Sequence, residues 1–160
     1  MVIDNNTSVA TRFWTLGEHA VGALDHIKPL AQLGARWYVA SVFFRSRLTK
    51  LHDWDTTLAL FTDEYHVPLL NPTVAAYLAT GAELGLSTLL VLGMFGRFAA
   101  AGLSVLNVVA VISLAEVADA ALTGHVFWGS LLGFLMLWGP GPLSLDHGLI
   151  ARLRRWVIKA

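Results

Sequence analysis

The segment 98–115, FAAAGLSVLNVVAVISLA, constrains the fold of this chain most strongly, because it contains no charged residue. A helix of a soluble bundle carries apolar and charged residues on opposite faces with a period of 3.6 residues, and this segment has no charged face. Its length is close to the ~20 residues that a helix needs to cross a lipid bilayer. The segment therefore predicts a membrane-spanning helix and disfavours a soluble helical bundle.

Three further apolar segments have the length of membrane spans. The chain is 56% hydrophobic and only 14% charged, whereas about 25% of the residues in a soluble domain are charged. Residues 30–140 are predicted to form one transmembrane domain, with spans at about 30–48, 73–95, 98–120 and 125–139. The fold class that follows is all-α, a polytopic membrane four-helix bundle.

Both flanks of this domain are predicted to be amphipathic helices that lie on the membrane surface. In residues 1–29, apolar side chains recur at steps of three and four residues, and Pro29 is expected to end the helix. In residues 141–160, apolar residues are combined with several cations and Trp156, a composition that suits an anionic lipid leaflet.

The distribution of lysine and arginine predicts the orientation in the membrane. Cytoplasmic loops of membrane proteins carry an excess of these two residues. An arrangement with both ends inside places Arg12, Lys28, Arg97 and the basic C-terminal segment on the cytoplasmic side. The acidic loop 50–72 is then outside. The chain is therefore expected to cross the membrane several times, with its N- and C-termini in the cytoplasm.

Glu83 lies inside the second predicted span, within LATGAELGLSTLLVLGMFG. An ionisable side chain at the centre of a membrane helix costs about 2.5–3.5 kcal/mol on insertion scales, so it normally faces the protein interior and has a partner. Asn107 and Ser104 on the third span are the expected partners, with Arg36 below them. A neutral, protonated carboxyl group is the alternative.

A second group of charges is predicted nearer the outer surface. A rise of 1.5 Å per residue from the middle of each span places Arg45 and Glu116 at similar depth, and Arg47 and Asp119 slightly further out. Glu116 and Asp119 are three residues apart and share a face of the expected helix 98–120. The candidate binding residues are Glu83, Arg36, Arg45, Arg47, Asn107, Glu116 and Asp119.

Two interpretations of these seven residues are open. They are structural ion pairs and hydrogen bonds that hold four helices together, or they form a polar pocket for a quinone headgroup or another small molecule, or a proton path. The spacing of the residues does not choose between these interpretations.

No metal site is predicted. His52, His66 and His125 are weak candidates, because imidazole and carboxylate groups gather in the outer loop and suit Zn²⁺ or Cu²⁺. However, the loop has no closely spaced ligand motif, and a solvated acidic loop has the same composition. The absence of cysteine excludes covalent haem c attachment and argues against an iron–sulfur cluster. No basic patch with interleaved aromatic residues points to nucleic acid.

The segment WGPGPLSLDHGLI, with Gly139-Pro140-Gly141-Pro142 followed by Leu143-Ser144-Leu145-Asp146, resembles the C-terminal signature of the DoxX family. Its prolines end the fourth span, and Ser144 or Asp146 is placed to cap the next helix. GAELGLSTLLVLGMFGRFAA is similar to the second span of the family, and ARWYVASVFFRSRLTKL to the first. The resemblance covers about residues 30–150.

This resemblance implies a small four-helix protein of the bacterial inner membrane. Some relatives are membrane subunits of a thiosulfate:quinone oxidoreductase. Others are partners in oxidative-stress complexes or are encoded beside machinery that makes metal-binding peptides. Glu83, Arg36, Arg45 or Arg47, and Asp146 fall where the family places polar residues. The first 29 residues and the long outer loop depart from the family pattern.

The leading hypothesis is a membrane subunit or partner of a redox or oxidative-stress system, with quinone as the candidate cofactor. If the chain is part of an enzyme, that enzyme is a quinone-dependent oxidoreductase. The alternatives are a non-enzymatic membrane anchor and a transport or metal-stress protein that acts with metal-binding-peptide machinery. The expected partners are lipid and soluble or membrane redox and stress proteins. Glycine pairs such as Gly81 and Gly85 also permit a homo-oligomer.

Overall fold

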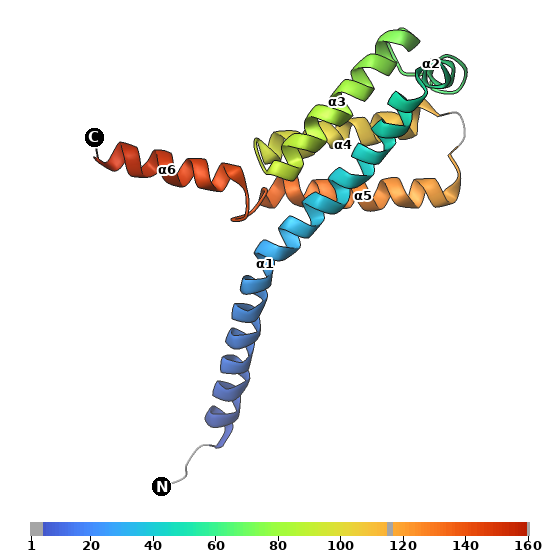
Figure 1. Cartoon of the computed structure of the whole chain (residues 1–160). Helices are drawn as coiled ribbons and strands as arrows, with labels where there is room; N and C mark the ends of the chain where they lie inside the picture. The colour runs from blue at the N-terminus through green and yellow to red at the C-terminus, as the bar shows by residue number, and fades with distance from the viewer. Residues whose placement is uncertain (1–4, 115–116, 160) are drawn as a thin grey trace.

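The protein is helical throughout the part of the chain that the structure describes. The computed structural model describes residues 5–114 and 117–159, and these residues form no strand, only one isolated bridge between Tyr65 and Leu114. The helices are α1 (Asn5–His52), α2 (Trp54–Asp63), α3 (Pro72–Leu92), α4 (Gly96–Ser113), α5 (Asp119–Trp138) and α6 (Leu145–Lys159) (Figure 1). The all-α prediction is confirmed.

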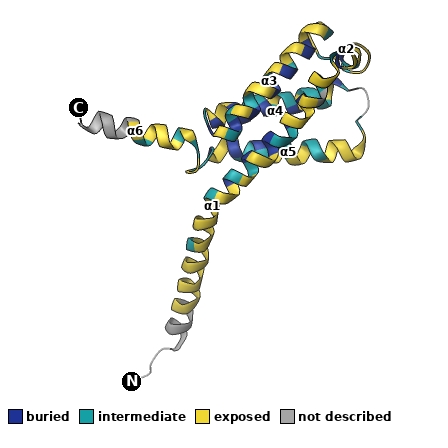
Figure 2. Ribbon diagram, in the orientation of Figure 1, coloured by how far each residue is buried: buried dark blue, intermediate teal, exposed yellow. Residues whose placement is uncertain are grey.

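Helix α1 continues through Pro29, so the prediction that a separate surface helix ends at this proline is wrong. A proline inside a helix removes one backbone hydrogen bond and bends the helix, but it does not prevent helix on both sides. Figure 1 shows that α1 changes direction between its blue N-terminal half and its cyan C-terminal half. The N-terminal half of α1 and α6 both project from the other helices, and residues 11–28 and 145–152 within them are mainly exposed (Figure 2).

Three helices, α3, α4 and α5, are long and apolar enough to cross a membrane. They confirm the positions of three predicted spans, although α4 ends at Ser113 instead of residue 120 and α5 already begins at Asp119. The segment 30–48, which was expected to be the first span, lies within α1 and is not among them. It contains Arg36, Arg45 and Arg47.

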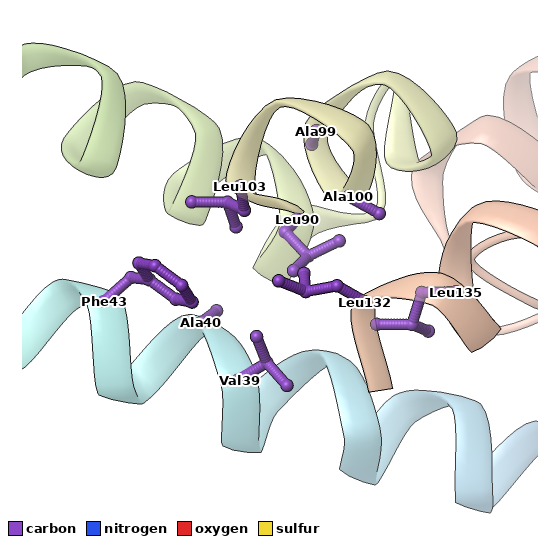
Figure 3. Packing of buried hydrophobic residues seen from close by; sticks show 9 residues of the cluster. All are labelled: Val39, Ala40, Phe43, Leu90, Ala99, Ala100, Leu103, Leu132 and Leu135. Carbon is purple, nitrogen blue, oxygen red and sulfur yellow. The ribbon is translucent and has the colours of Figure 1, made fainter. Parts of the chain in front are cut away.

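The C-terminal half of α1 packs with α3, α4 and α5 around one apolar core. Leu90, Leu103 and Leu132 are completely buried in this core, together with Val39 and Leu135 (Figure 3). The alanines Ala40, Ala99 and Ala100 also line it, and their small side chains let the helix backbones approach closely. The side chains of Val105, Val108 and Ile112 are exposed on α4, as is expected where a helix faces lipid.

Helix α2 and the loop after it cover one end of this core. Phe61 of α2 is buried against Ala75 and Ala76 of α3. The hydroxyl of Thr57 donates to the carbonyl of Lys50, 2.9 Å away, and the backbone N–H of His66 donates to the carbonyl of Ser113 at 2.8 Å. These contacts tie the ends of α1 and α4 to the same covering segment.

The segment between α5 and α6 closes the opposite end. The carboxylate of Asp146 accepts hydrogen bonds from the backbone N–H groups of Phe95 and Gly96, each at 2.8 Å, and so caps α4. Ser144 caps α6 itself, since its hydroxyl accepts from the N–H of His147 at 3.2 Å. Arg36 of α1 donates to the carbonyl of Leu143. The proposed capping role of Ser144 is thus confirmed, while Asp146 caps a helix distant in sequence.

We expect Asp146→Ala to lower the free energy of unfolding by about 2 kcal/mol. The variant leaves two N–H donors of α4 without an acceptor, and loss of a helix cap alone costs roughly 0.5–2 kcal/mol. It also removes a negative charge that attracts the buried Arg36. Unfolding in mixed detergent micelles measures the change, with Asp25→Ala as the control, because Asp25 forms an exposed pair with Lys28. Equal stability of both variants would contradict the capping role.

Candidate functional site: a cavity between five helices

A cavity of about 460 Å³ lies between the core helices and beneath α2. Its walls are mostly apolar and include Val42, Phe43, Leu78, Leu106, Val109 and Trp128. Six of its lining residues carry hydroxyl or ionisable groups, namely Ser46, Lys50, Tyr65, Glu83, Ser113 and His125. An apolar pocket with a few convergent polar groups is the usual form of a small-molecule site.

Lys50 and Glu83 form an ion pair across the cavity wall. The Nζ of Lys50 on α1 lies 2.6 Å from Oε1 of Glu83 on α3, and both side chains are largely buried. Glu83 is therefore paired, which is one of the two predicted alternatives. Its partner is Lys50, however, and not the expected Asn107 or Ser104. The error arises because α1 extends to His52, which places Lys50 on a helix instead of in the predicted loop.

Asn107 pairs with His125 instead. Its Nδ2 donates to the His125 carbonyl at 2.9 Å, and its Oδ1 lies 2.8 Å from Nδ1 of the imidazole ring. Because Oδ1 only accepts, this arrangement assigns the proton to Nδ1 and leaves Nε2 as an acceptor. The ring also meets Trp128 edge to face, with centroids 5.0 Å apart. Ser104 is satisfied by the carbonyl of Ala100.

Two residues that line the cavity carry buried oxygens with no hydrogen-bond partner among the described residues. These are the second carboxylate oxygen of Glu83, Oε2, and the hydroxyl oxygen of Ser113. A buried polar atom without a partner costs about 1–3 kcal/mol, so native proteins contain few of them. Both oxygens belong to a site that has room for a bound molecule.

Of the predicted outer cluster of Arg45, Arg47, Glu116 and Asp119, the described structure forms no ion pair between Arg47 and Asp119. Asp119 is exposed in the first turn of α5, since α4 ends before it, and Glu116 lies outside the described residues. Arg47 lies over the ring of Phe44, 4.6 Å from its centroid, and lines a different hollow. The Arg45 side chain is exposed. Asp119 has a local role instead, because a negative charge in the first turn of α5 stabilises that helix.

Arg36 is also distant from the cavity. It is 1% exposed and contacts the segment before α6, at the opposite end of the core from α2. Of the six predicted binding residues that the structure describes, only Glu83 lines the cavity, while Asn107 contacts the lining residue His125.

Sequence reasoning missed Lys50, Tyr65 and Ser113 as site residues. One signal for Lys50 was available: Leu48 and Leu51 continue the apolar pattern of the first span beyond Arg47. Tyr65 stacks on Phe61 with ring centroids 5.0 Å apart, a contact that depends on where α2 folds back. No sequence pattern indicates that fold.

The histidines of the outer loop are not arranged as a metal site in the described structure. No group of three or more His, Asp or Glu side chains in residues 5–114 and 117–159 has a suitable arrangement. His52 and His66 are exposed. Asp53 caps α2, and hydrogen bonds from the side chain and backbone of Thr56 hold the pKa of its carboxyl group below the ordinary value. The acidic loop thus uses a carboxylate to begin a helix.

Comparison with known proteins identifies the family of the chain. The family model of DoxX matches residues 31–116, more than half of the chain, and this range includes Lys50, Glu83 and Ser113. The segment Gly139–Asp146, on which the resemblance was first based, lies after the matched range. No curated protein and no solved structure matches the chain. Together with the three apolar helices, the family match shows that this chain is a membrane protein of the DoxX family.

Proposed function

We propose that this protein binds a quinone in the cavity and serves as the membrane subunit or partner of a redox or oxidative-stress system. The observation that carries the proposal is the buried Lys50–Glu83 pair in the wall of an otherwise apolar cavity. The proposed setting is a bacterial inner membrane, crossed four times, with the N- and C-termini in the cytoplasm.

Two contacts support the entry of α1 into the membrane as the first of these four spans. Buried charges are tolerated there when they have partners inside the protein. Lys50 is paired with Glu83, and Arg36 donates to the Leu143 carbonyl near Asp146. The positive-inside pattern supports the orientation, which places α2 outside.

The dimensions and chemistry of the cavity fit a quinone ring. Its volume of about 460 Å³ lies within the roughly 300–1,000 Å³ of typical small-molecule sites. The Lys50 ammonium has three N–H donors, and the hydrogen bond to Glu83 uses one of them. A second N–H and the Ser113 hydroxyl are donors for a quinone carbonyl. The quinone supplies the electron chemistry, while the protein binds and orients it.

The first experiment is purification of the tagged protein from its own host in mild detergent, followed by extraction of bound quinone and mass spectrometry of co-purified proteins. We expect about one quinone per chain, together with a soluble or membrane redox protein. Ala110→Leu fills part of the cavity and is expected to lower the quinone content several-fold. Val108→Leu is the control, since Val108 is exposed on the same helix. Equal quinone content in the two variants would exclude the cavity as the site.

A membrane anchor or assembly partner is the second candidate. The exposed N-terminal half of α1 carries Phe13 and Trp14, each 72% exposed, and projects away from the core. Recovery of peptide-maturation or metal-binding proteins without quinone would favour this role, including its transport or metal-stress form.

A further inference from the structure

A second hollow lies between α1 and α3, apart from the cavity described above. It has a volume of about 420 Å³ and is lined by Arg47, Leu51, Trp54, Tyr77, Thr80, Gly81 and Leu84. None of these residues lines the cavity that contains Lys50 and Glu83. Because Tyr77 and Leu51 are 60% and 52% exposed, the hollow is a groove on the outer face of the helices.

Two buried hydrogen-bond donors in this groove lack partners. Arg47 is only 8% exposed, yet its Nε has no hydrogen-bond partner among the described residues, and its one described electrostatic contact is the Phe44 ring. Thr80 is 6% exposed, and its hydroxyl also has no partner within the described part of the chain. A buried charge without a counter-ion is strongly unfavourable. Both groups therefore point to a ligand that accepts hydrogen bonds and carries negative charge.

The guanidinium group of Arg47 indicates which anionic groups the ligand carries. Its planar set of N–H donors matches the oxygens of phosphate or carboxylate. The Thr80 hydroxyl lies in the same groove and can donate to the same group. Leu51, Leu84 and Gly81 form an apolar continuation, and the space above Gly81 is open, since a Cβ added to this residue would meet no atom within 4 Å.

The position of the groove favours a lipid over a soluble anion. Arg47 lies five residues before the end of α1 at His52, which corresponds to roughly 7–8 Å at 1.5 Å per residue. A long arginine side chain at this depth reaches the level of the lipid headgroups. Trp54 and Tyr77, with ring centroids 4.6 Å apart, border the groove, and such aromatic residues are enriched at the membrane interface.

We propose that this groove binds an anionic phospholipid of the leaflet on the α2 side of the membrane. Arg47 and Thr80 hold the phosphate group, and one acyl chain lies along Gly81 and Leu84. The site is independent of the quinone cavity, so it does not require the proposed redox function.

The test uses the full-length protein, delipidated in detergent, with thermal unfolding and native mass spectrometry as readouts. Phosphatidylglycerol is expected to raise the unfolding temperature and to remain bound. Phosphatidylcholine is expected to bind at least tenfold more weakly, and inorganic phosphate and oleate are expected to cause little change. Arg47→Gln should remove the effect of phosphatidylglycerol. Arg45→Gln is the matched control, because it removes an equal charge from an exposed residue on the same helix.

Thr80→Val provides a second test that leaves all charges in place, with an expected three- to tenfold weakening of phosphatidylglycerol binding. Equal effects of Arg45→Gln and Arg47→Gln would overturn the proposal, as would equal binding of the two phospholipids. Equal stabilisation by inorganic phosphate or oleate would show a general anion site instead. A dimer that dissociates in Arg47→Gln without bound lipid would assign the groove to a second copy of the chain.

Discussion

Lys50→Met is expected to lower the free energy of unfolding by about 3–5 kcal/mol. Removal of one member of a buried ion pair leaves the other charge without compensation, and this penalty exceeds the net energy of the pair itself. Here the carboxylate of Glu83 would stay among apolar residues of α3, with Oε2 already lacking a partner among the described residues. Unfolding in mixed detergent micelles measures the loss.

The chain provides its own control, because the described residues contain a second lysine pair in a different environment. Lys28 lies 2.7 Å from Asp25, but both side chains are more than half exposed. An exposed pair contributes about 0–1 kcal/mol, so Lys28→Met should change the stability little. Similar losses in the two variants would contradict the description of Lys50–Glu83 as a buried pair.

The double variant Lys50→Met/Glu83→Leu separates stability from binding. Replacement of both charges by apolar groups of similar size is often neutral or stabilising, so most of the lost stability should return. Quinone binding should not return, because the Lys50 ammonium that donates to the quinone carbonyl is gone, although Ser113 remains in the cavity wall. A stable double variant with full quinone content would show that the ion pair is structural only.

The sequence predicted three of the four spans well, because an uncharged run such as 98–115 leaves a chain few alternatives to a buried or membrane helix. It also identified Glu83 as a buried acid, either paired or protonated. It did not predict the partner, because a shift of a few residues in the end of α1 decides whether Lys50 belongs to a loop or to a helix. Such boundaries are the least certain part of a sequence-based prediction.

The pairing of Arg47 with Asp119 by depth was wrong for a different reason. Arg47 and Asp119 have similar expected depths, but depth says nothing about the direction in which a side chain points around its helix. Arg47 borders the outer groove, whereas Lys50, only three residues later, borders the cavity. For a related reason, the sequence did not predict the capping role of Asp146. Its carboxylate caps α4, which begins fifty residues earlier in the chain, and not α6. These pairings depend on how the helices pack.

Substitution of Gly93 is expected to have the second large effect on the free energy of unfolding. It ends α3 with a positive φ of 65°, a conformation that disfavours residues with a Cβ atom by roughly 1–2 kcal/mol. An added Cβ would also overlap the guanidinium of Arg36 and lie 2.5 Å from the Cβ of Ser144. The Arg36 side chain cannot move away freely, because it is buried and hydrogen-bonded to Leu143.

Gly93→Ala is therefore expected to lower the free energy of unfolding by about 3–5 kcal/mol, the sum of backbone strain and a disturbed buried charge. Gly85→Ala is the matched control, because Gly85 lies in the middle of α3 and has open space at its Cβ position. Alanine is favoured over glycine within a helix by up to ~1 kcal/mol, so this control should be slightly more stable than the wild type. If Gly93→Ala were as stable as Gly85→Ala, then α3, Arg36 and the segment before α6 could not be packed as closely as described.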